Sequence, residues 1–407
     1  MAEPLTLEKI KEAAERLRGV IHRTPLDFSA TFSRLTGSQV YLKLENLQKT
    51  GSFKIRGAYY KICSLDEASR KKGVIAASAG NHAQGVAYAA RCAGIPSLVV
   101  MPENAPVSKV AATLGYGAQV VLAGEDYDRA YVRARELQKE YGATFVPSFD
   151  DPAVIAGQGT VALELLADLP DLDAVVVPVG GGGLISGIAL AVKKQKAAVK
   201  IVGVQAENAP YAYNLFCGAE SRDGFPGART IADGINVRRP GEITAGLISR
   251  YVDEMVLVGE EEIAQAILLL LERSKLVVEG AGAVGLAALL SARARLPAKK
   301  VAVVISGGNV DINLLSIVIE RGLVKSGRRL NIGVVLPDQP GSLARLLALL
   351  AGVRANLISV NHDRIKPEVP LKEARVDLVL EARDQAHRQL ILDTLAKEGY
   401  KVKNTSN

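Results

Sequence analysis

The 407-residue chain is poor in cysteine and histidine, and the few of each that it has are scattered. Its three cysteines, at positions 63, 92 and 217, form no Cys-x-x-Cys pair. This spacing excludes a disulfide scaffold and a structural zinc site, and it indicates a reducing compartment. The four histidines include no His-Glu-x-x-His pair. We assign no metal-binding residue, and whether a monovalent or divalent cation is bound stays open.

Long runs of one charge are also missing, although the formal net charge is +7. No like-charge run reaches five residues, which argues against a nucleic-acid-binding tail. The charged, helical pattern of residues 1–17 is not that of a signal peptide. The uncharged stretch 174–192 contains Pro178 and four glycines, which favours a strand, a loop and a helix over a membrane span. We therefore expect a soluble cytoplasmic protein without nucleic-acid or membrane partners.

With 48% hydrophobic and 23% charged residues, the chain can bury a large core and form two or three domains. From about residue 70, short apolar runs alternate with helix-length segments. Such runs predict parallel sheets covered by helices on both faces, arranged here as two α/β lobes with ligands at the carboxyl ends of the strands. The predicted strands cover 73–78, 97–101, 118–123, 143–146, 174–179, 200–204, 254–258 and 301–305.

The composition changes after about residue 322, where residues 323–329 predict a basic, glycine-containing linker. The remaining segment, 330–407, predicts a small separate domain of order βαββαβ, the ferredoxin-like arrangement. Its strands are expected at 330–336, 356–365, 374–382 and 401–404, and its helices at 341–353 and 384–400.

Four consecutive glycines, Gly180 to Gly183, precede Leu184 between a predicted strand and a predicted helix. They allow a tight turn whose N–H groups point one way at a helix N-terminus, which is a phosphate cradle. A plain strand-to-helix turn is the alternative, but it needs only one or two glycines, and the others cost conformational entropy. We therefore predict phosphate binding, although the chain contains no P-loop motif.

A second glycine motif, Gly280-x-Gly282-x-x-Gly285, matches the dinucleotide-binding fingerprint. No Asp or Glu lies between Gly285 and Asp311, where a ribose-binding acid is expected. The small residues around the motif favour close helix packing. A nicotinamide-dependent oxidoreductase remains the distant alternative.

Three other loops carry polar residues that have ordinary structural explanations when each is taken singly. Lys54, in the segment Ser52 to Gly57, fits a surface lysine; Asn81, in the segment Ser78 to His82, fits a helix N-cap. Ser306, after the strand 301–305, fits a turn residue.

Together, these loops resemble the fold type II (tryptophan-synthase-β-like) pyridoxal-phosphate enzymes, and most closely the threonine dehydratases, also called threonine ammonia-lyases. The resemblance begins at about His22 and continues to the end of the chain. It implies pyridoxal 5'-phosphate as cofactor and a two-lobed fold. The large lobe would comprise 1–48 and 150–322, and the small lobe 49–149.

The resemblance also implies a role for each loop. Lys54 would bond covalently to the cofactor and act as base at the substrate Cα, while Ser306 would face the pyridine nitrogen and Asn81 the 3-oxygen. The implied catalytic residue is Lys54; the cofactor-binding residues are Phe53, Lys54, Asn81, Gly180, Gly181, Gly182, Gly183, Leu184 and Ser306; the substrate-binding residues are Ser78, Ala79, Gly80, Asn81 and His82.

The expected reaction converts L-threonine to 2-oxobutanoate and ammonia. One methyl group is worth only about 1 kcal/mol in a pocket, so L-serine is also expected to react, giving pyruvate. Serine racemases of the same fold carry a serine where this chain has Ala79, and alanine cannot move a proton. Gln205 stands where the family's divalent-cation acid is expected, with Glu207 two residues further on.

The C-terminal segment resembles an ACT domain, the regulatory amino-acid-binding module. Asp338 to Leu343 fits its D-x-P-G-x-L turn, and residues 355–364 fit its second strand. The resemblance implies an amino-acid effector and a homodimer or homotetramer. A plain dimerisation module, and a non-catalytic amino-acid sensor, are the alternatives. The effector, its sign, and a role in isoleucine synthesis or in threonine breakdown stay open.

Overall fold

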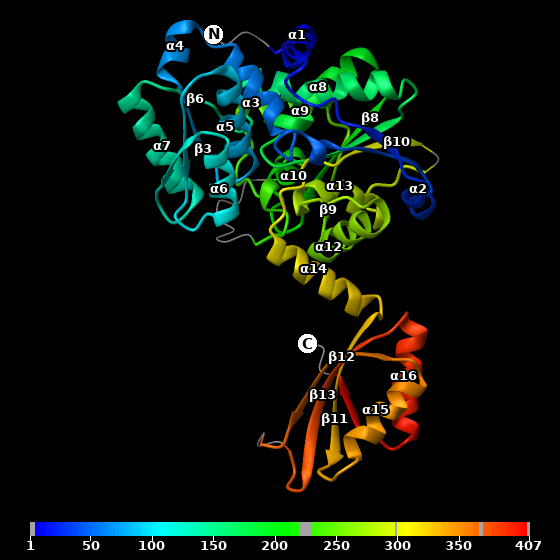
Figure 1. Ribbon diagram of the computed structural model, residues 1–407. Coiled ribbons are helices and arrows are strands. Elements are labelled where there is room, and N and C mark those ends of the chain that lie inside the picture. Colours follow the sequence, from blue (N-terminus) through cyan, green and yellow to red (C-terminus); the bar gives the residue numbers. More distant parts are fainter. Residues whose placement is uncertain (1–4, 220–228, 298, 366–368, 405–407) are drawn as a thin grey trace. The chain divides into compact units, whose positions relative to one another are not determined.

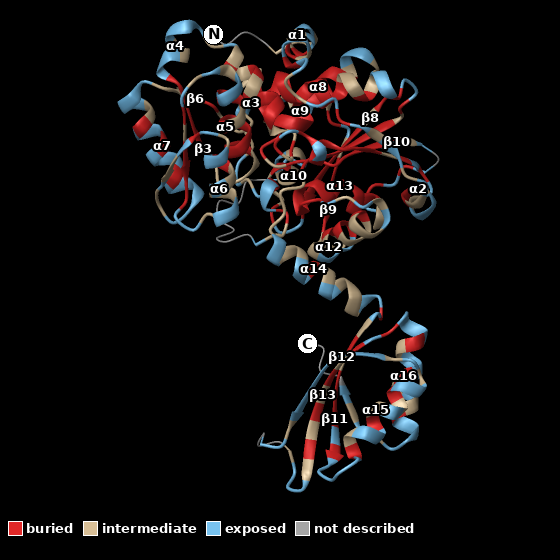
Figure 2. Ribbon diagram, viewed as in Figure 1, coloured by how far each residue is buried: buried red, intermediate tan, exposed pale blue. Residues whose placement is uncertain are grey.

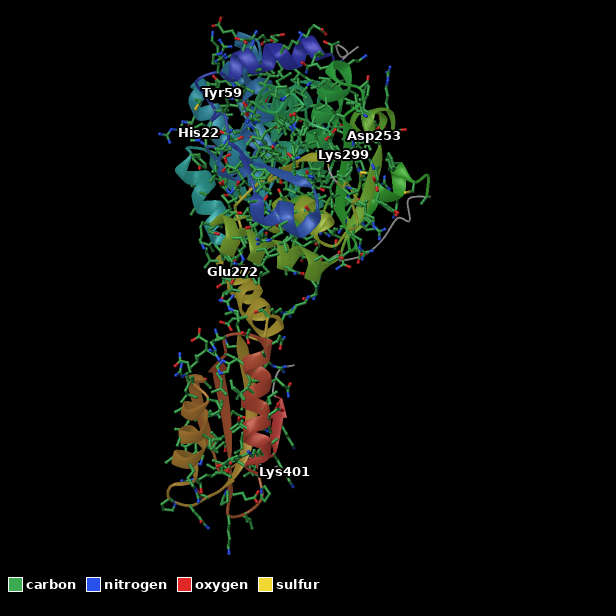
Figure 3. The ribbon with its side chains drawn as sticks, turned by 90° about the vertical axis from the view of Figure 1, so that its right-hand side faces the viewer. His22, Tyr59, Asp253, Glu272, Lys299 and Lys401 are labelled. Atoms are coloured by element: carbon green, nitrogen blue, oxygen red, sulfur yellow. The ribbon has the colours of Figure 1, made fainter. Side chains whose placement is uncertain are left out.

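The computed structural model describes residues 5–219, 229–297, 299–365 and 369–404. The chain forms two compact units, Met1–Asp311 and Ile312–Asn407 (Figure 1). In Figure 3, Lys401 marks the second unit, and the other five labelled residues belong to the first. Among the described residues, no helix is both long enough and apolar enough to cross a membrane.

The first unit contains two sheets, and eight of their ten strands follow the predicted apolar runs; the strands at 26–28 and 39–43 were not predicted. The larger sheet is parallel except for its edge strand β1, and the smaller sheet is wholly parallel. The prediction of parallel α/β sheets is therefore confirmed. The larger sheet runs in the order β1 (Leu26–Phe28), β2 (Gln39–Lys43), β10 (Lys300–Val304), β7 (Ala174–Pro178), β8 (Lys200–Ala206) and β9 (Glu254–Val258); the smaller in the order β5 (Gln119–Leu122), β4 (Ser97–Met101), β3 (Val74–Ala77) and β6 (Thr144–Phe145).

Helices connect these strands and cover the sheets. The longer helices are α1 (Leu7–Leu17), α3 (Lys54–Cys63), α5 (Asn81–Ala93), α6 (Val107–Gly115), α7 (Tyr127–Tyr141), α8 (Pro152–Asp168), α9 (Gly183–Gln195), α11 (Glu242–Tyr251), α12 (Glu260–Leu269) and α13 (Gly280–Leu290). The shorter elements are α2 (Ala30–Thr36), α4 (Glu67–Lys72), α10 (Tyr211–Phe216), the 3₁₀ turns η1 (Glu45–Leu47) and η2 (Asp233–Ile235), and the π-helical segment η3 (Leu270–Ser274).

Helices α8, α9 and α13 carry the most continuous burial in the first unit (Figure 2). Glycines let α8 and α9 approach closely: a Cβ at Gly187 would lie 2.4 Å from the carbonyl oxygen of Ile155. Glycines also allow a close approach of the backbone in the dinucleotide-like motif at Gly280 to Gly285. A Cβ at Gly280 would lie 2.2 Å from the oxygen of Ile231, and one at Gly282 would lie 2.6 Å from that of Gly307. Close helix packing therefore accounts for the motif, as favoured from the sequence.

Four charged side chains meet in the interior of this unit and balance in charge. The Arg56 guanidinium contacts Glu45 at 2.7 Å and Glu164 at 2.7 Å, and the Lys43 ammonium contacts Glu164 at 2.5 Å. Burial alone would raise the pKa of Glu45, but the Arg56 charge holds it below its usual value. This cluster joins β2, η1, α3 and α8, and so fastens helix α3, which begins at Lys54, to the larger sheet.

The second unit begins with helix α14 (Ile312–Lys325). The segment 323–329, predicted as a linker, is instead the end of α14 and a short turn before β11. Leu323 and Val324 continue the apolar pattern of the helix, and Gly327, at φ 74°, lies in the left-handed region just beyond its end. The remaining elements follow the predicted order: β11 (Arg329–Pro337), α15 (Ser342–Gly352), β12 (Asn356–Asp363), β13 (Glu373–Glu381), α16 (Gln385–Lys397) and β14 (Val402–Asn404).

These strands form an antiparallel sheet in the order β12-β13-β11-β14. Alternate residues of β11, including Ile332 and Val334, pack with Leu346 of α15 and Ile391 of α16 in a separate hydrophobic core. This core lets the C-terminal segment fold as a unit with its own interior.

Candidate active site

Lys54 is the first residue of α3, and the chain before it lies alongside the loop after β10. Ser52 and Gly307 form an isolated β-bridge, and the Phe53 N–H donates to the Ser306 carbonyl at 3.1 Å. The structure therefore brings Lys54, Phe53 and Ser306 together, although about 250 residues separate the two segments in the sequence.

Lys54 is half-buried, and its amine donates to the Ser148 carbonyl at 3.0 Å. Burial lowers the pKa of Lys54 to about 8, against the opposing effect of the Glu279 carboxylate. About a tenth of the amine is consequently uncharged at pH 7. An uncharged amine is the form that attacks a carbonyl and accepts a proton.

The loop from Ser78 to His82 follows β3 and leads into α5, which begins at Asn81. The Gly80 N–H donates to the Ser78 hydroxyl at 3.2 Å. Helix α5 passes close to Lys54, because a Cβ at Gly85 would lie 3.1 Å from the Lys54 carbonyl carbon. The N-terminus of α5 thus offers N–H donors to an anion beside the reactive amine.

His82 was expected among the substrate-binding residues, but its imidazole is not suited to hold a carboxylate through charge. The ring is buried, and Nε2 lies 2.8 Å from the Val146 carbonyl, which can only accept. Nε2 therefore carries the proton. Burial and the charge of Lys54 lower the pKa of His82 to about 3, so the ring is neutral.

The glycine loop, Gly180 to Gly183, connects β7 to α9, and Gly182 has φ 91°. The neighbours explain every glycine of the run. A Cβ at Gly181 would lie 2.3 Å from the Phe149 ring, one at Gly183 3.0 Å from the Phe149 Cα, and one at Gly180 3.0 Å from Ile235. Packing and backbone conformation therefore favour glycine at all four positions, contrary to the expectation that a plain turn needs only one or two. What supports a phosphate here is the N-terminus of a 13-residue helix and its surroundings.

Ser148 and Phe149 link the glycine loop to the reactive lysine. The Ser148 carbonyl accepts from Lys54, and the next residue covers Gly181 and Gly183. The loops after β3, β7 and β10 thus converge at the carboxyl ends of parallel strands, where α/β sheets bind ligands.

Glu279, which the sequence analysis did not single out, lies at the centre of this convergence. It directly precedes α13, and its carboxylate accepts from the Asn81 side-chain amide at 2.7 Å. Burial and the Asp233 charge raise the pKa of Glu279 to about 7, against the effects of Lys109, Asn81 and Lys54. The small residues that follow Glu279 suggested helix packing and gave no signal for a polar role.

The polar groups of this region suit pyridoxal phosphate. An amine with a depressed pKa is available for the aldehyde, helix N–H groups for the phosphate, and an amide and a hydroxyl for the ring. In addition, Thr50 Oγ1, Ser52 Oγ and His82 Nδ1 are buried without a partner among the described residues. Unsatisfied buried polar atoms are costly, so their concentration here supports a polar ligand.

The sequence model of the family "Pyridoxal-phosphate dependent enzyme" matches residues 17–307. The chain belongs to this family. The L-threonine ammonia-lyase of Thermotoga maritima is 54% identical over 401 residues, 98% of this chain and 99% of that protein. The L-threonine dehydratase catabolic TdcB of Escherichia coli is 46% identical over 316 residues, 77% of this chain and 95% of TdcB. The solved maize serine racemase has a TM-score of 0.74 and 35% identity, covering 79% of this chain and 99% of the racemase.

Pyridoxal phosphate is therefore the cofactor of this chain. Of the two residues considered for a cation, Gln205 accepts from the Tyr213 N–H at 3.0 Å, and Glu207 pairs with Arg293 at 3.2 Å. Within the described residues, no group of three His, Cys, Asp or Glu side chains is arranged to hold a metal.

Replacing Gly182 with alanine is expected to weaken pyridoxal-phosphate binding by about tenfold or more. The left-handed backbone costs an alanine about 1–2 kcal/mol, and its Cβ would lie 2.8 Å from Ile248 and 2.9 Å from Thr244, so the loop must shift. Fluorescence titration of the apoprotein with cofactor measures the dissociation constant. Gly246→Ala, where the added Cβ meets open space, is the matched control; equal affinities for the two variants would contradict the prediction.

Proposed function

We propose that this protein is an L-threonine dehydratase (ammonia-lyase) that converts L-threonine to 2-oxobutanoate and ammonia, and L-serine to pyruvate and ammonia. The observation that carries the proposal is the Lys54 amine, with its lowered pKa, beside the N-terminus of α5. The near-full-length identity to an L-threonine ammonia-lyase supports the same substrate class.

Lys54 and the loop beside it have separate roles, one in proton transfer and the other in substrate binding. Pyridoxal phosphate, when bound, supplies a conjugated ring that accepts the electron pair left at the substrate Cα. The uncharged Lys54 Nζ removes the Cα proton. The N–H groups at Ser78 to Asn81 hold the substrate carboxylate, since a helix N-terminus favours an anion.

The remaining cofactor contacts follow the same assignment. The N–H groups of Gly180 to Gly183 and Leu184 would hold the phosphate, Phe53 would lie beside the ring, and Ser306 would present a hydroxyl to the pyridine nitrogen. A hydroxyl does not keep that nitrogen protonated as a carboxylate would. An unprotonated pyridine nitrogen is a weaker electron acceptor, which favours elimination over transamination.

Racemisation is disfavoured because it needs a second acid–base group on the opposite face of Cα. Ala79 carries only a methyl group, which cannot donate or accept a proton. We therefore propose dehydration for this chain, although its fold is also that of maize serine racemase.

Purified protein supplied with pyridoxal phosphate and L-threonine tests the proposal. We expect equal amounts of 2-oxobutanoate and ammonia, and with L-serine equal amounts of pyruvate and ammonia. Chiral chromatography of the remaining serine is expected to give only the L form. D-serine without keto acid would make the chain a racemase, and neither product would refute both assignments.

The two sheets of the first unit support a division into two lobes. We propose that residues 49–149, with the four-stranded sheet, form the small lobe. Residues 1–48 and the segment from 150 onward, with the six-stranded sheet, form the large lobe. Because α14 belongs to the second unit, we place the end of the large lobe near residue 311 rather than at 322.

The second unit is proposed as an ACT-type ferredoxin-like domain that binds an amino-acid effector such as isoleucine or valine. Its support lies at the start of α15. Gly341 has φ 89°, the Ser342 hydroxyl is buried without a partner among the described residues, and Arg364 pairs with Asp338 at 3.0 Å. A helix N-terminus with an unsatisfied hydroxyl suits a carboxylate.

The exposed apolar side chains of the edge strand β12 support self-association. Leu357, Ile358 and Val360 are 37%, 47% and 42% exposed, and an unpaired edge strand is a template for pairing with another chain. We propose that two copies pair through this strand, giving a homodimer or a homotetramer.

Ending the chain after residue 311 is expected to leave L-threonine turnover within about twofold and to abolish its response to isoleucine or valine, since linkage between effector and substrate needs the second site. The E. coli relative supports an independent catalytic unit, because 77% of this chain covers 95% of it. The rate of 2-oxobutanoate formation is measured with and without each amino acid. In the full chain, Ser342→Ala should reduce the change in rate that isoleucine or valine causes. A truncated enzyme whose rate still changes with these amino acids would contradict the ACT assignment.

A further inference from the structure

The Asn81 side-chain amide is held between two other polar side chains, from opposite sides. Its Nδ2 donates to Glu279 Oε1 at 2.7 Å, and its Oδ1 accepts from Asn309 Nδ2 at 2.7 Å. Asn309 Nδ2 also donates to the Thr50 carbonyl at 2.9 Å. The chain of hydrogen bonds thus connects the loop before Lys54, the loop after β10, the start of α5 and the start of α13.

The direction of every bond in this chain follows from its two ends. The Thr50 carbonyl can only accept, so Asn309 must turn its NH₂ group toward it. The second N–H of that group then donates to Asn81 Oδ1. Asn81 Nδ2 consequently faces Glu279, whose carboxylate accepts. A flip of either amide would set two acceptors or two donors against each other.

This arrangement leaves one N–H of Asn81 Nδ2 without a partner among the described residues. We propose that Glu279 is a positioning residue: with Asn309 it fixes the Asn81 amide so that this N–H donates to the 3-oxygen of pyridoxal phosphate. The inference rests on the proposed cofactor contact of Asn81 and adds the residues that orient it.

The surroundings of Glu279 suit this role. The side chain is 4% exposed, and a Cβ at Gly307 would lie 2.3 Å from its Oε1, so glycine is needed to leave room for the carboxylate. The charged groups that act on Glu279 are Lys54 of α3, Lys109 of α6 and Asp233 of η2. Lys109 and Asp233 pair with each other at 2.8 Å, and Asp311 also acts on Lys109.

The charge of Glu279 changes near neutral pH, because its pKa is raised to about 7. Above this pH the carboxylate is ionised and accepts a strong, charge-assisted bond from Asn81; below it the neutral acid accepts a weaker one. The Asn81 amide is therefore held more firmly as the pH rises. The absorbance of the bound cofactor should report this transition, since the 3-oxygen belongs to its chromophore.

Two measurements on the full-length holoenzyme test the positioning role: the dissociation constant for pyridoxal phosphate and the pH titration of the cofactor absorbance. Glu279→Ala is expected to weaken cofactor binding by about tenfold. Glu279→Gln, which can still accept from Asn81, should restore most of the affinity but lose the transition near neutral pH. Glu136→Gln, at an exposed acid on α7, is the matched control.

Two variants of the Lys109–Asp233 pair beside Glu279 test the direction in which each neighbouring charge shifts this transition. Asp233→Asn removes the negative charge that raises the pKa of Glu279 and should shift the transition to lower pH. Lys109→Met removes the opposing positive charge and should shift it to higher pH. Equal midpoints in both variants and the unmodified protein would overturn the assignment of the transition to Glu279.

Asn309→Asp tests the other end of this series of hydrogen bonds. It also provides the measurement if the Glu279→Ala protein does not fold. An aspartate at this position cannot donate to the Thr50 carbonyl or to Asn81, so cofactor binding should again weaken by about tenfold. Wild-type affinity in a folded Glu279→Ala or Asn309→Asp protein would overturn the positioning role. A protein that binds no pyridoxal phosphate at all would instead refute the proposed function.

Discussion

Replacing Lys54 with alanine is expected to lower the rate of 2-oxobutanoate formation from L-threonine by on the order of 10⁴-fold or more. The substitution removes both the covalent attachment of the cofactor and the base at Cα. An outside base such as bulk water cannot replace a positioned group.

Lys71→Ala is the control, because Lys71 is an exposed lysine that pairs with the exposed Glu67 on the preceding helical turn. It should retain full activity. Reduction of the holoenzyme with borohydride, followed by mass spectrometry, should find the cofactor on the peptide that contains Lys54 and on none in the Lys54→Ala protein. Cofactor attached to a different lysine, or substantial activity in Lys54→Ala, would contradict the assignment.

Much of the fold could be predicted from the sequence because the parallel strands are buried on both faces. Such strands consist of nearly uninterrupted apolar residues, as in Ala174–Pro178 and Lys300–Val304, and the pattern is visible without neighbours. Boundaries were harder to predict. The helix Ile312–Lys325 continues into the basic residues that suggested a linker, because helical pattern and linker composition overlap there.

The candidate site was predictable where short segments carry unusual residues, as at Lys54, Asn81 and the glycine run. Glu279 was not, because its significance lies in a contact with Asn81 across 198 residues of sequence. Asn309 was not singled out either, since the direction of its amide depends on the Thr50 carbonyl. Side-chain partners that come together only in the folded protein leave no local pattern.

For the glycine run, the sequence suggested more than it could support, because the number of glycines was taken as evidence for a phosphate site. Conformational entropy suggested that packing could not require four glycines. However, a Cβ at three of them would lie 3.0 Å or less from Phe149 or Ile235, and the fourth has a left-handed backbone. The phosphate assignment for Gly180 to Gly183 consequently depends on the helix N-terminus and on the family, and not on the number of glycines.

Replacing Arg56 with alanine is expected to lower the free energy of unfolding by about 3–5 kcal/mol, a large part of the 5–15 kcal/mol typical of a folded protein. Arg56 is fully buried and contacts Glu45 and Glu164. Its removal leaves two carboxylates with Lys43 as the one remaining cation of the cluster. Chemical denaturation followed by circular dichroism measures the change, with the apoprotein used so that cofactor binding does not contribute.

The pH dependence separates the lost charge from the lost packing. In the native cluster the pKa of Glu45 is below its ordinary value, so its contribution to stability is present above the unfolded-state pKa and is lost as the pH falls through the folded-state pKa. Without Arg56, burial is expected to raise the pKa of Glu45 instead. Lowering the pH should therefore reduce the difference in free energy of unfolding between the variant and the unmodified protein. Arg133→Ala, which removes an exposed pair with Glu136, should change stability by less than about 1 kcal/mol. If the difference in free energy of unfolding stays constant from neutral to acidic pH, Arg56 stabilises helix α3 by packing alone.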